Sequence, residues 1–180
     1  MTITDAQQDM RHAYFGGATG LLASACVWLA AGVFAVARSP TSAVVALLVG
    51  GMMIHPLAIL LSKALGRPGS HKPGNPLGRL ALEGTVFFLL GIPLACVVSR
   101  FRIEWFFPAM LLLIGGRYLT FATVYGLRHY WVCGATLAAA AFLLVALGGP
   151  VAAGALAGAL VESGFALAVF AAARTRRPAA

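Results

Sequence analysis

Four residues that can carry a charge or exchange a proton lie inside otherwise apolar stretches of the sequence: His55, Glu83, Arg117 and Glu162. Histidine changes protonation near neutral pH, arginine stays cationic and binds anions, and a carboxyl group accepts or releases a proton. Tyr125 adds a hydroxyl that can donate or accept a hydrogen bond. Together these side chains could bind a small polar or anionic solute, or pass protons, inside a helical bundle.

Each of these residues also has a structural interpretation. An interhelical hydrogen bond accounts for His55 as well as a proton-transfer role does, and an ion pair accounts for Arg117 and Glu162. Glu83 lies close to the start of its predicted helix, where the helix dipole favours a carboxylate. Pairing with Arg117 predicts an ionised Glu162, whereas an apolar pocket without a cation predicts a neutral one. The sequence leaves these alternatives open.

The surroundings of these residues indicate lipid as the solvent. Of 180 residues, 61% are hydrophobic and only 10% are charged, whereas soluble domains carry about 25% charged residues. The net charge of +8 does not indicate a nucleic-acid partner, because the Lys and Arg residues lie between apolar runs instead of forming one basic face. The bias of basic residues toward the cytoplasmic side of membrane proteins explains the same excess.

A membrane-crossing helix needs about 20 mostly apolar residues. Six stretches meet that requirement, so we predict an all-α, polytopic bundle forming a single membrane domain over residues 1–180, with spans at 15–37, 41–65, 80–99, 105–126, 130–148 and 150–173. Residues 66–79 form the longest connection, which is basic and rich in Gly and Pro. It could contact anionic lipid headgroups or serve as a flexible turn.

The flanking charges predict an orientation. Six spans place both termini and the second and fourth connections on one side, with nine basic residues: Arg11, Lys63, Arg67, Lys72, Arg79, Arg128, Arg174, Arg176 and Arg177. The other side receives three: Arg38, Arg100 and Arg102. The richer side is expected to face the cytoplasm, so we predict cytoplasmic N and C termini in a bacterial inner membrane.

Small residues suggest how the helices pack. Gly154, Gly158, Glu162 and Ala166 follow one another at intervals of four, so they form one face of the sixth span and direct Glu162 into the bundle. The same small residues could support a homo-oligomer. The openings Gly17-Ala18-Thr19, Glu83-Gly84-Thr85 and Gly134-Ala135-Thr136 are compatible with three repeated hairpins. Similar triplets also arise by chance in sequences rich in Ala and Gly.

Motifs for enzymatic or metal chemistry are absent from the sequence. The three cysteines, Cys26, Cys96 and Cys133, stand apart from one another, and no HExxH, CxxC, GxSxG or phosphate-loop pattern occurs. We therefore expect no metal site, no cofactor, no nucleic-acid partner and no catalytic residues. The expected partners are membrane lipids and a small polar or anionic solute.

Three stretches resemble an uncharacterised bacterial family of small six-span membrane proteins that carries a domain-of-unknown-function label. The stretches run from Gly50-Gly51-Met52-Met53-Ile54-His55-Pro56-Leu57, through Asn75-Pro76-Leu77-Gly78-Arg79-Leu80-Ala81-Leu82-Glu83, to Phe107-Pro108-Ala109-Met110 with Gly115-Gly116-Arg117-Tyr118 and Tyr125-Gly126. The resemblance implies a membrane bundle and no particular chemistry.

Taken together, the sequence predicts a small transporter or channel-like protein in which a polar cluster lies between helices. Its candidate pathway residues are His55, Arg117, Glu162, Glu83 and Tyr125. The alternative is a non-transporting scaffold, sensor or stress-related protein whose buried charges fix the register of the helices.

Overall fold

The computed structural model describes residues 1–175, and this part of the chain is helical without strands. The two basic residues Arg176 and Arg177 of the predicted cytoplasmic side lie outside the described residues. Seven α-helices follow one another: α1 (Ile3–Tyr14), α2 (Ala18–Ala37), α3 (Pro40–Ala64), α4 (Pro76–Phe101), α5 (Phe106–Tyr125), α6 (His129–Ala146) and α7 (Val151–Thr175). Short 3-10 segments, η1 (Phe15–Gly17) and η2 (Ile103–Trp105), precede α2 and α5.

The described chain has six candidate membrane spans that are long and apolar enough to cross a bilayer; the first, Ile3–Ala37, takes in α1 and α2, and the other five contain α3 to α7. This confirms the predicted class, an all-α bundle with six spans. One boundary differs clearly, because α4 begins at Pro76 and not at residue 80. The side chain of Asn75 accepts a hydrogen bond from the Leu77 amide at 3.0 Å, and Pro76 supplies the backbone angle of a first helical residue.

Helix α1 was not predicted from the sequence. Its start is fixed by a capping box, in which the Thr2 hydroxyl accepts from the Asp5 amide and the Asp5 carboxylate accepts from the Thr2 amide. Ala6, Met10 and Ala13 form its buried face. The chain then turns sharply through η1, where Gly16 and Gly17 have φ angles of 64° and 90°, a conformation that glycine adopts without a steric penalty.

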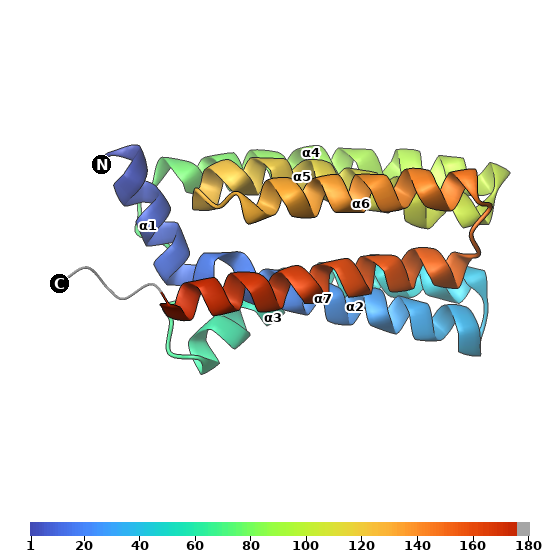
Figure 1. The fold of residues 1–180 in the computed structure, drawn as a ribbon, viewed down its shortest axis with the longest axis horizontal. Helices are drawn as coiled ribbons and strands as arrows, with labels where there is room; N and C mark the ends of the chain where they lie inside the picture. Colours follow the sequence, from blue (N-terminus) through green and yellow to red (C-terminus); the bar gives the residue numbers. More distant parts are fainter. Residues whose placement is uncertain (176–180) are drawn as a thin grey trace.

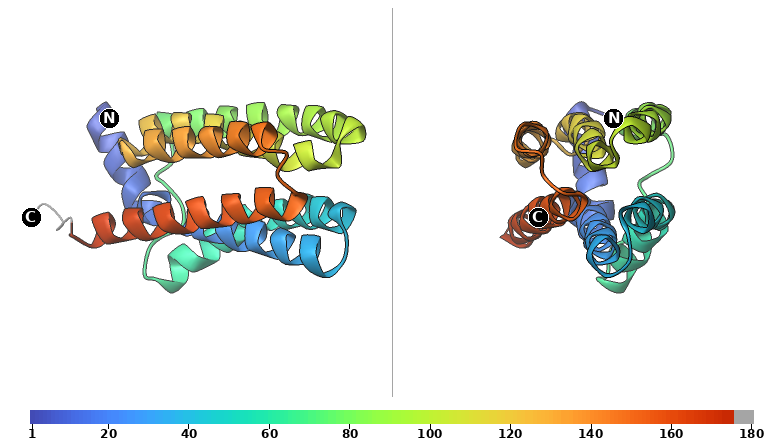
Figure 2. Two further views of the ribbon diagram at one scale, coloured as in Figure 1. Left: turned by 45° about the vertical axis from the view of Figure 1, so that its right-hand side comes forward. Right: turned by 90° about the vertical axis from the view of Figure 1, so that its right-hand side faces the viewer.

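The helices form two layers of three (Figure 1). Helices α4, α5 and α6 form one layer and α2, α3 and α7 form the other, while α1 lies across the end at which both termini are found. Viewed along the bundle, α5 and α2 occupy the middle of their layers, and successive helices follow one another around the assembly (Figure 2). The hairpins α2–α3 and α4–α5 each lie within a layer, whereas α6–α7 connects the two layers.

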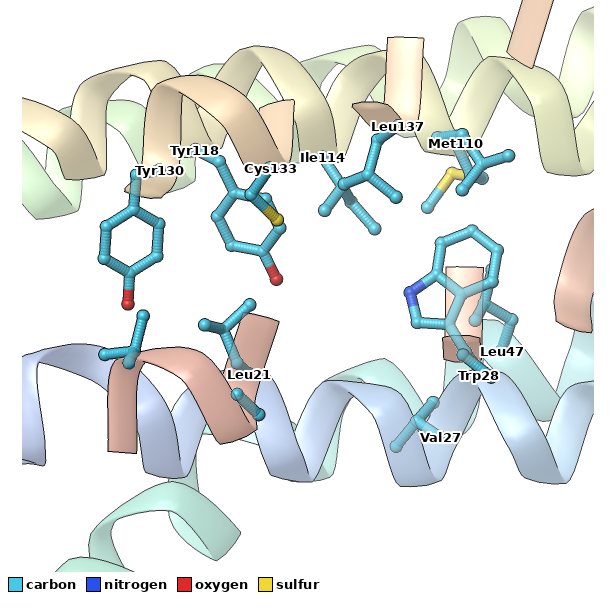
Figure 3. Close-up of a cluster of buried hydrophobic side chains, with 14 of the residues drawn as sticks. Leu21, Val27, Trp28, Leu47, Met110, Ile114, Tyr118, Tyr130, Cys133 and Leu137 are labelled. Carbon is cyan, nitrogen blue, oxygen red and sulfur yellow. The ribbon is translucent and has the colours of Figure 1, made fainter. Parts of the chain in front are cut away.

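Large side chains fill the space between the layers (Figure 3). Tyr118, Tyr130 and Leu137 point down from α5 and α6 toward Leu21 and Trp28 of α2. All five are 5% exposed or less. Because lipid provides little hydrophobic force between helices, this close packing must supply much of the attraction between the layers.

The small-residue face predicted for the last span is present in α7, where Gly154, Gly158, Glu162 and Ala166 are all buried. A Cβ atom placed on Gly158 would lie 2.5 Å from the Trp28 ring, and one on Gly154 would lie 2.6 Å from Phe107 Cβ. The glycines therefore allow α7 to approach α2 and α5 more closely than any larger residue would permit.

Replacing Gly158 by alanine is expected to lower the free energy of unfolding by about 1–3 kcal/mol, because the added methyl group must displace the Trp28 ring. Gly164 is the matched control, since it lies on the same helix and no other side chain comes within 4 Å of the place that an added methyl group would take. Equilibrium unfolding in detergent micelles measures both variants. An equal change for Gly158→Ala and Gly164→Ala would show that close approach at Gly158 is unimportant.

Candidate functional site

The carboxyl group of Glu162 lies between the two layers and is 0% exposed. It comes from the buried face of α7, and the hydroxyl of Tyr118 on α5 donates to its Oε1 at 2.7 Å. Figure 3 shows the Tyr118 hydroxyl pointing from its own layer toward the opposite one. A hydrogen bond therefore joins the middle helix of one layer to α7 of the other.

Two side chains of α2 complete the surroundings of this carboxyl. Ser24 and Trp28, one helical turn apart, lie beside Glu162, and both can donate a hydrogen bond. We call Glu162, Tyr118, Ser24 and Trp28 the Glu162 cluster. Within the described residues, neither Oε2 of Glu162 nor Nε1 of Trp28 makes a hydrogen bond. The Tyr118 hydroxyl is therefore the one donor with a defined hydrogen bond to this carboxyl among the described residues.

Of the two alternatives that the sequence left open for Glu162, the ion pair with Arg117 is absent from the described structure. Arg117 instead donates from Nη2 to the Thr85 hydroxyl on α4 at 3.0 Å, and its guanidinium lies 5.0 Å from the centre of the Phe121 ring and 5.6 Å from that of Phe88. The reason is geometric. Neighbouring residues on an α-helix point about 100° apart, so when Tyr118 faces α7, Arg117 must face α4.

Two other predicted residues lie outside the Glu162 cluster. His55 on α3 and Glu83 on α4 are both exposed on the surface of the bundle. Neither makes a hydrogen bond or ion pair with Arg117 or Glu162 in the described part of the chain. The structure therefore does not unite the sequence candidates in a single cluster.

Tyr125, the fifth candidate, is buried in a group of aromatic rings. Its ring stacks on Tyr130 at 5.4 Å and meets the edge of Phe121 at 5.7 Å, while Tyr118 lies 5.8 Å from Tyr130. The Tyr130 hydroxyl donates to the Gly16 carbonyl at 2.7 Å. These rings extend from the Glu162 cluster to the turn between α1 and α2.

Sequence reasoning missed Tyr118, Tyr130, Ser24 and Trp28. Tyr118 follows Arg117 in the sequence, and its hydroxyl marks it as a possible hydrogen-bonding residue within an apolar span. That role can be recognised only once the buried face of the helix is known. Ser24 and Trp28 share a face of α2 at an interval of four. Nothing in their own types distinguishes them from ordinary core residues.

Helix α1 closes the bundle at the end near the tyrosine rings. Gln7 donates from Nε2 to the Thr123 carbonyl at 2.8 Å, and Arg11 donates from Nη1 to the Tyr125 carbonyl at 2.6 Å. These two carbonyls belong to the last turn of α5, where they have no partner within the helix. The side chains of α1 thus cap α5 and hold α1 across the end of the bundle.

The connection between α3 and α4 fixes α1 from the other side. Asn75 donates from Nδ2 to the Ala6 carbonyl at 3.1 Å and to Asp9 Oδ2 at 2.7 Å. The Lys72 amide donates to the same oxygen at 3.0 Å, and the Gly69 amide donates to the Ala13 carbonyl at 3.1 Å. The basic connection is therefore attached to α1 at several points along its length.

Removing the Tyr118 hydroxyl is expected to lower the free energy of unfolding by about 1–3 kcal/mol, because a buried carboxyl loses its hydrogen-bond donor. Tyr125→Phe is the matched control on the same helix, since its hydroxyl makes no hydrogen bond within the described residues. Unfolding in detergent compares Tyr118→Phe with this control. Equal losses would contradict the importance of the bond to Glu162.

Replacing Asn75 by alanine is expected to release α1, because the substitution removes a helix cap together with both bonds to α1. Hydrogen–deuterium exchange should increase in residues 3–14 and in the first turn of α4. Ser70→Ala, an exposed change in the same connection, is the control and should leave exchange as it is. Unchanged exchange in Asn75→Ala would mean that Asn75 does not hold α1 in place.

Comparisons with known proteins bear on this arrangement. No curated protein and no solved structure matches the chain. A family model does match, over residues 3–172, and its description is a family of unknown function, DUF7010. This match confirms the resemblance to an uncharacterised family of small membrane proteins. The chain, a multi-pass membrane protein by its six apolar helices, belongs to the DUF7010 family.

Proposed function

We propose that this protein is a small transporter that couples the passage of a polar or anionic solute to proton exchange at Glu162. The observation that carries the proposal is the complete burial of this carboxyl between two helical layers, without a paired cation in the described structure. An ionisable group at such a place costs a few kcal/mol, and an apolar side chain of similar volume would often be more stabilising. A role in function explains the group better than a role in stability.

The two layers supply a means of exposing the carboxyl. Tyr118 and Glu162 belong to different layers, so separation of the layers at one end would break their hydrogen bond and admit water. A carboxyl in the dry, closed interface is favoured in its neutral form, whereas contact with water favours release of the proton. Opening toward alternate ends would then load and release one proton per cycle.

Arg117 is the residue that we propose meets the solute. Its guanidinium lies between α4 and α5 against the faces of Phe88 and Phe121, and its Nε has no hydrogen-bond partner in the described residues. A guanidinium with a free N–H binds carboxylate or phosphate oxygens well. These features favour an anionic solute, or a polar one with an exposed oxygen.

We further propose that the membrane is a bacterial inner membrane and that both termini face the cytoplasm. Support comes from the basic residues of the described chain. Seven are in the segments at the end that carries both termini: Arg11, Lys63, Arg67, Lys72, Arg79, Arg128 and Arg174. Three, Arg38, Arg100 and Arg102, are in the connections at the opposite end. Such an imbalance is typical of the cytoplasmic side.

A non-transporting role is the second candidate. The closed packing around Glu162 favours it, because large side chains such as Trp28 and Tyr118 fill the interface. In this case the hydrogen bond would fix how the layers meet, as buried polar groups do in some proteins. A scaffold or sensor of this kind would need no solute and no proton exchange.

Transport assays on proteoliposomes distinguish the two candidates. Protein would be reconstituted with a pH-sensitive dye inside the vesicles and exposed to a panel of small carboxylates, phosphate and neutral polar solutes. We expect at least one anion to change the internal pH. Glu162→Gln, which keeps the size of the side chain but cannot ionise, should reduce that signal at least tenfold.

The exposed Glu83 provides the matched control, since Glu83→Gln removes a carboxyl from the outer surface of α4. It should leave the proton signal intact. If no solute moves protons in the wild-type protein while Glu162→Leu lowers the free energy of unfolding, the transporter proposal is wrong and the structural candidate holds. A loss of signal in Glu83→Gln equal to that in Glu162→Gln would also contradict the role given to Glu162.

A further inference from the structure

A separate pocket lies at the end of the bundle opposite the termini. It has a volume of about 400 Å³ and is formed where η2 meets the connection between α6 and α7. The residues that line it include Arg102, Glu104, Trp105, Leu144, Gly148 and Gly149. Its size is within the range of small-ligand sites in proteins. It takes no part in the proposed chemistry at Glu162.

The pocket presents opposite charges that do not neutralise each other. Arg102 and Glu104 both line it, yet they form no ion pair in the described part of the chain. The Arg102 guanidinium lies instead over the Trp105 ring, 5.7 Å from its centre, which leaves the edge of the guanidinium available to oxygen ligands. A site with a separate cation and anion is complementary to a ligand that carries both charges.

The position of the pocket narrows the choice of ligand. It lies where α4 and α6 end and α5 and α7 begin, so its opening is expected near the boundary between hydrocarbon and water. Tryptophan is typical of this boundary. Phosphate groups and ammonium groups of lipids are found at the same depth, in the headgroup region.

We propose that this pocket binds a phosphoethanolamine group, with the phosphate on Arg102 and the ammonium on Glu104. Guanidinium groups bind phosphate oxygens through paired hydrogen bonds, and a carboxylate is the natural partner of a primary ammonium. The Trp105 ring holds the guanidinium in place by a cation–π contact. The same pairing of a phosphate with a primary ammonium is present in a membrane lipid, where the phosphate is a diester with one negative charge, and in the free compound, where it is a monoester with close to two.

Titration calorimetry on the full chain in a maltoside detergent tests the pairing of charges. O-phosphoethanolamine should bind at least tenfold more tightly than inorganic phosphate or ethanolamine alone. Arg102→Gln and Glu104→Gln should each weaken binding at least tenfold. Arg100→Gln is the matched control, because Arg100 is an exposed arginine nearby that does not line the pocket.

A second measurement separates the two sources. The protein in nanodiscs would be examined by native mass spectrometry after exchange with phosphatidylethanolamine or phosphatidylglycerol. Retention of phosphatidylethanolamine over phosphatidylglycerol, dependent on Arg102 and Glu104, identifies the lipid headgroup as the ligand. Binding of O-phosphoethanolamine in calorimetry without such retention identifies a soluble zwitterion. The proposal is overturned if inorganic phosphate binds as tightly as O-phosphoethanolamine, if Arg100→Gln weakens binding as much as Arg102→Gln does, or if neither O-phosphoethanolamine nor phosphatidylethanolamine binds.

Discussion

The hydrogen bond from Tyr118 to Glu162 is the constraint on which the arrangement of the two layers depends. Hydrocarbon offers a carboxyl group no water, so the protein itself must provide donors, and here the donor with a defined bond comes from the opposite layer. That requirement fixes which faces of α5 and α7 meet. The glycines of α7 then let the backbone come close enough for the bond to form.

The lengths of the helices followed from the sequence because a bilayer imposes a minimum apolar run, and this run is visible in the residue types. The buried face of α7 could also be predicted from the sequence, since Gly154, Gly158, Glu162 and Ala166 follow one another at intervals of four residues. Helix α1 was missed because its buried residues are spaced along one face and form no long apolar run of the kind by which the other helices were predicted. Its capping residues, Thr2 and Asp5, were the available signal.

The partner of Glu162 could not be derived in the same way. The position of a residue along its helix, and so its depth in the membrane, can be estimated from the sequence. Which neighbouring helix its side chain faces depends on how the helices pack. Arg117 and Tyr118 have nearly the same depth and face different helices. Likewise, His55 lies within an apolar stretch of the sequence, yet on α3 it is exposed on the outer surface of the bundle. Only the packing of the whole bundle shows which helix each of these side chains faces.

Helix α4 depends on the surrounding bilayer for most of its contacts. Only 6% of its most apolar stretch is buried within the protein, against 50% for α5, and α5 is the helix on which it packs most extensively. Acyl chains must therefore provide most of its contacts. Its attachment is governed by the thickness and lateral pressure of the lipid as much as by the protein, so α4 is the first helix that solubilisation would loosen.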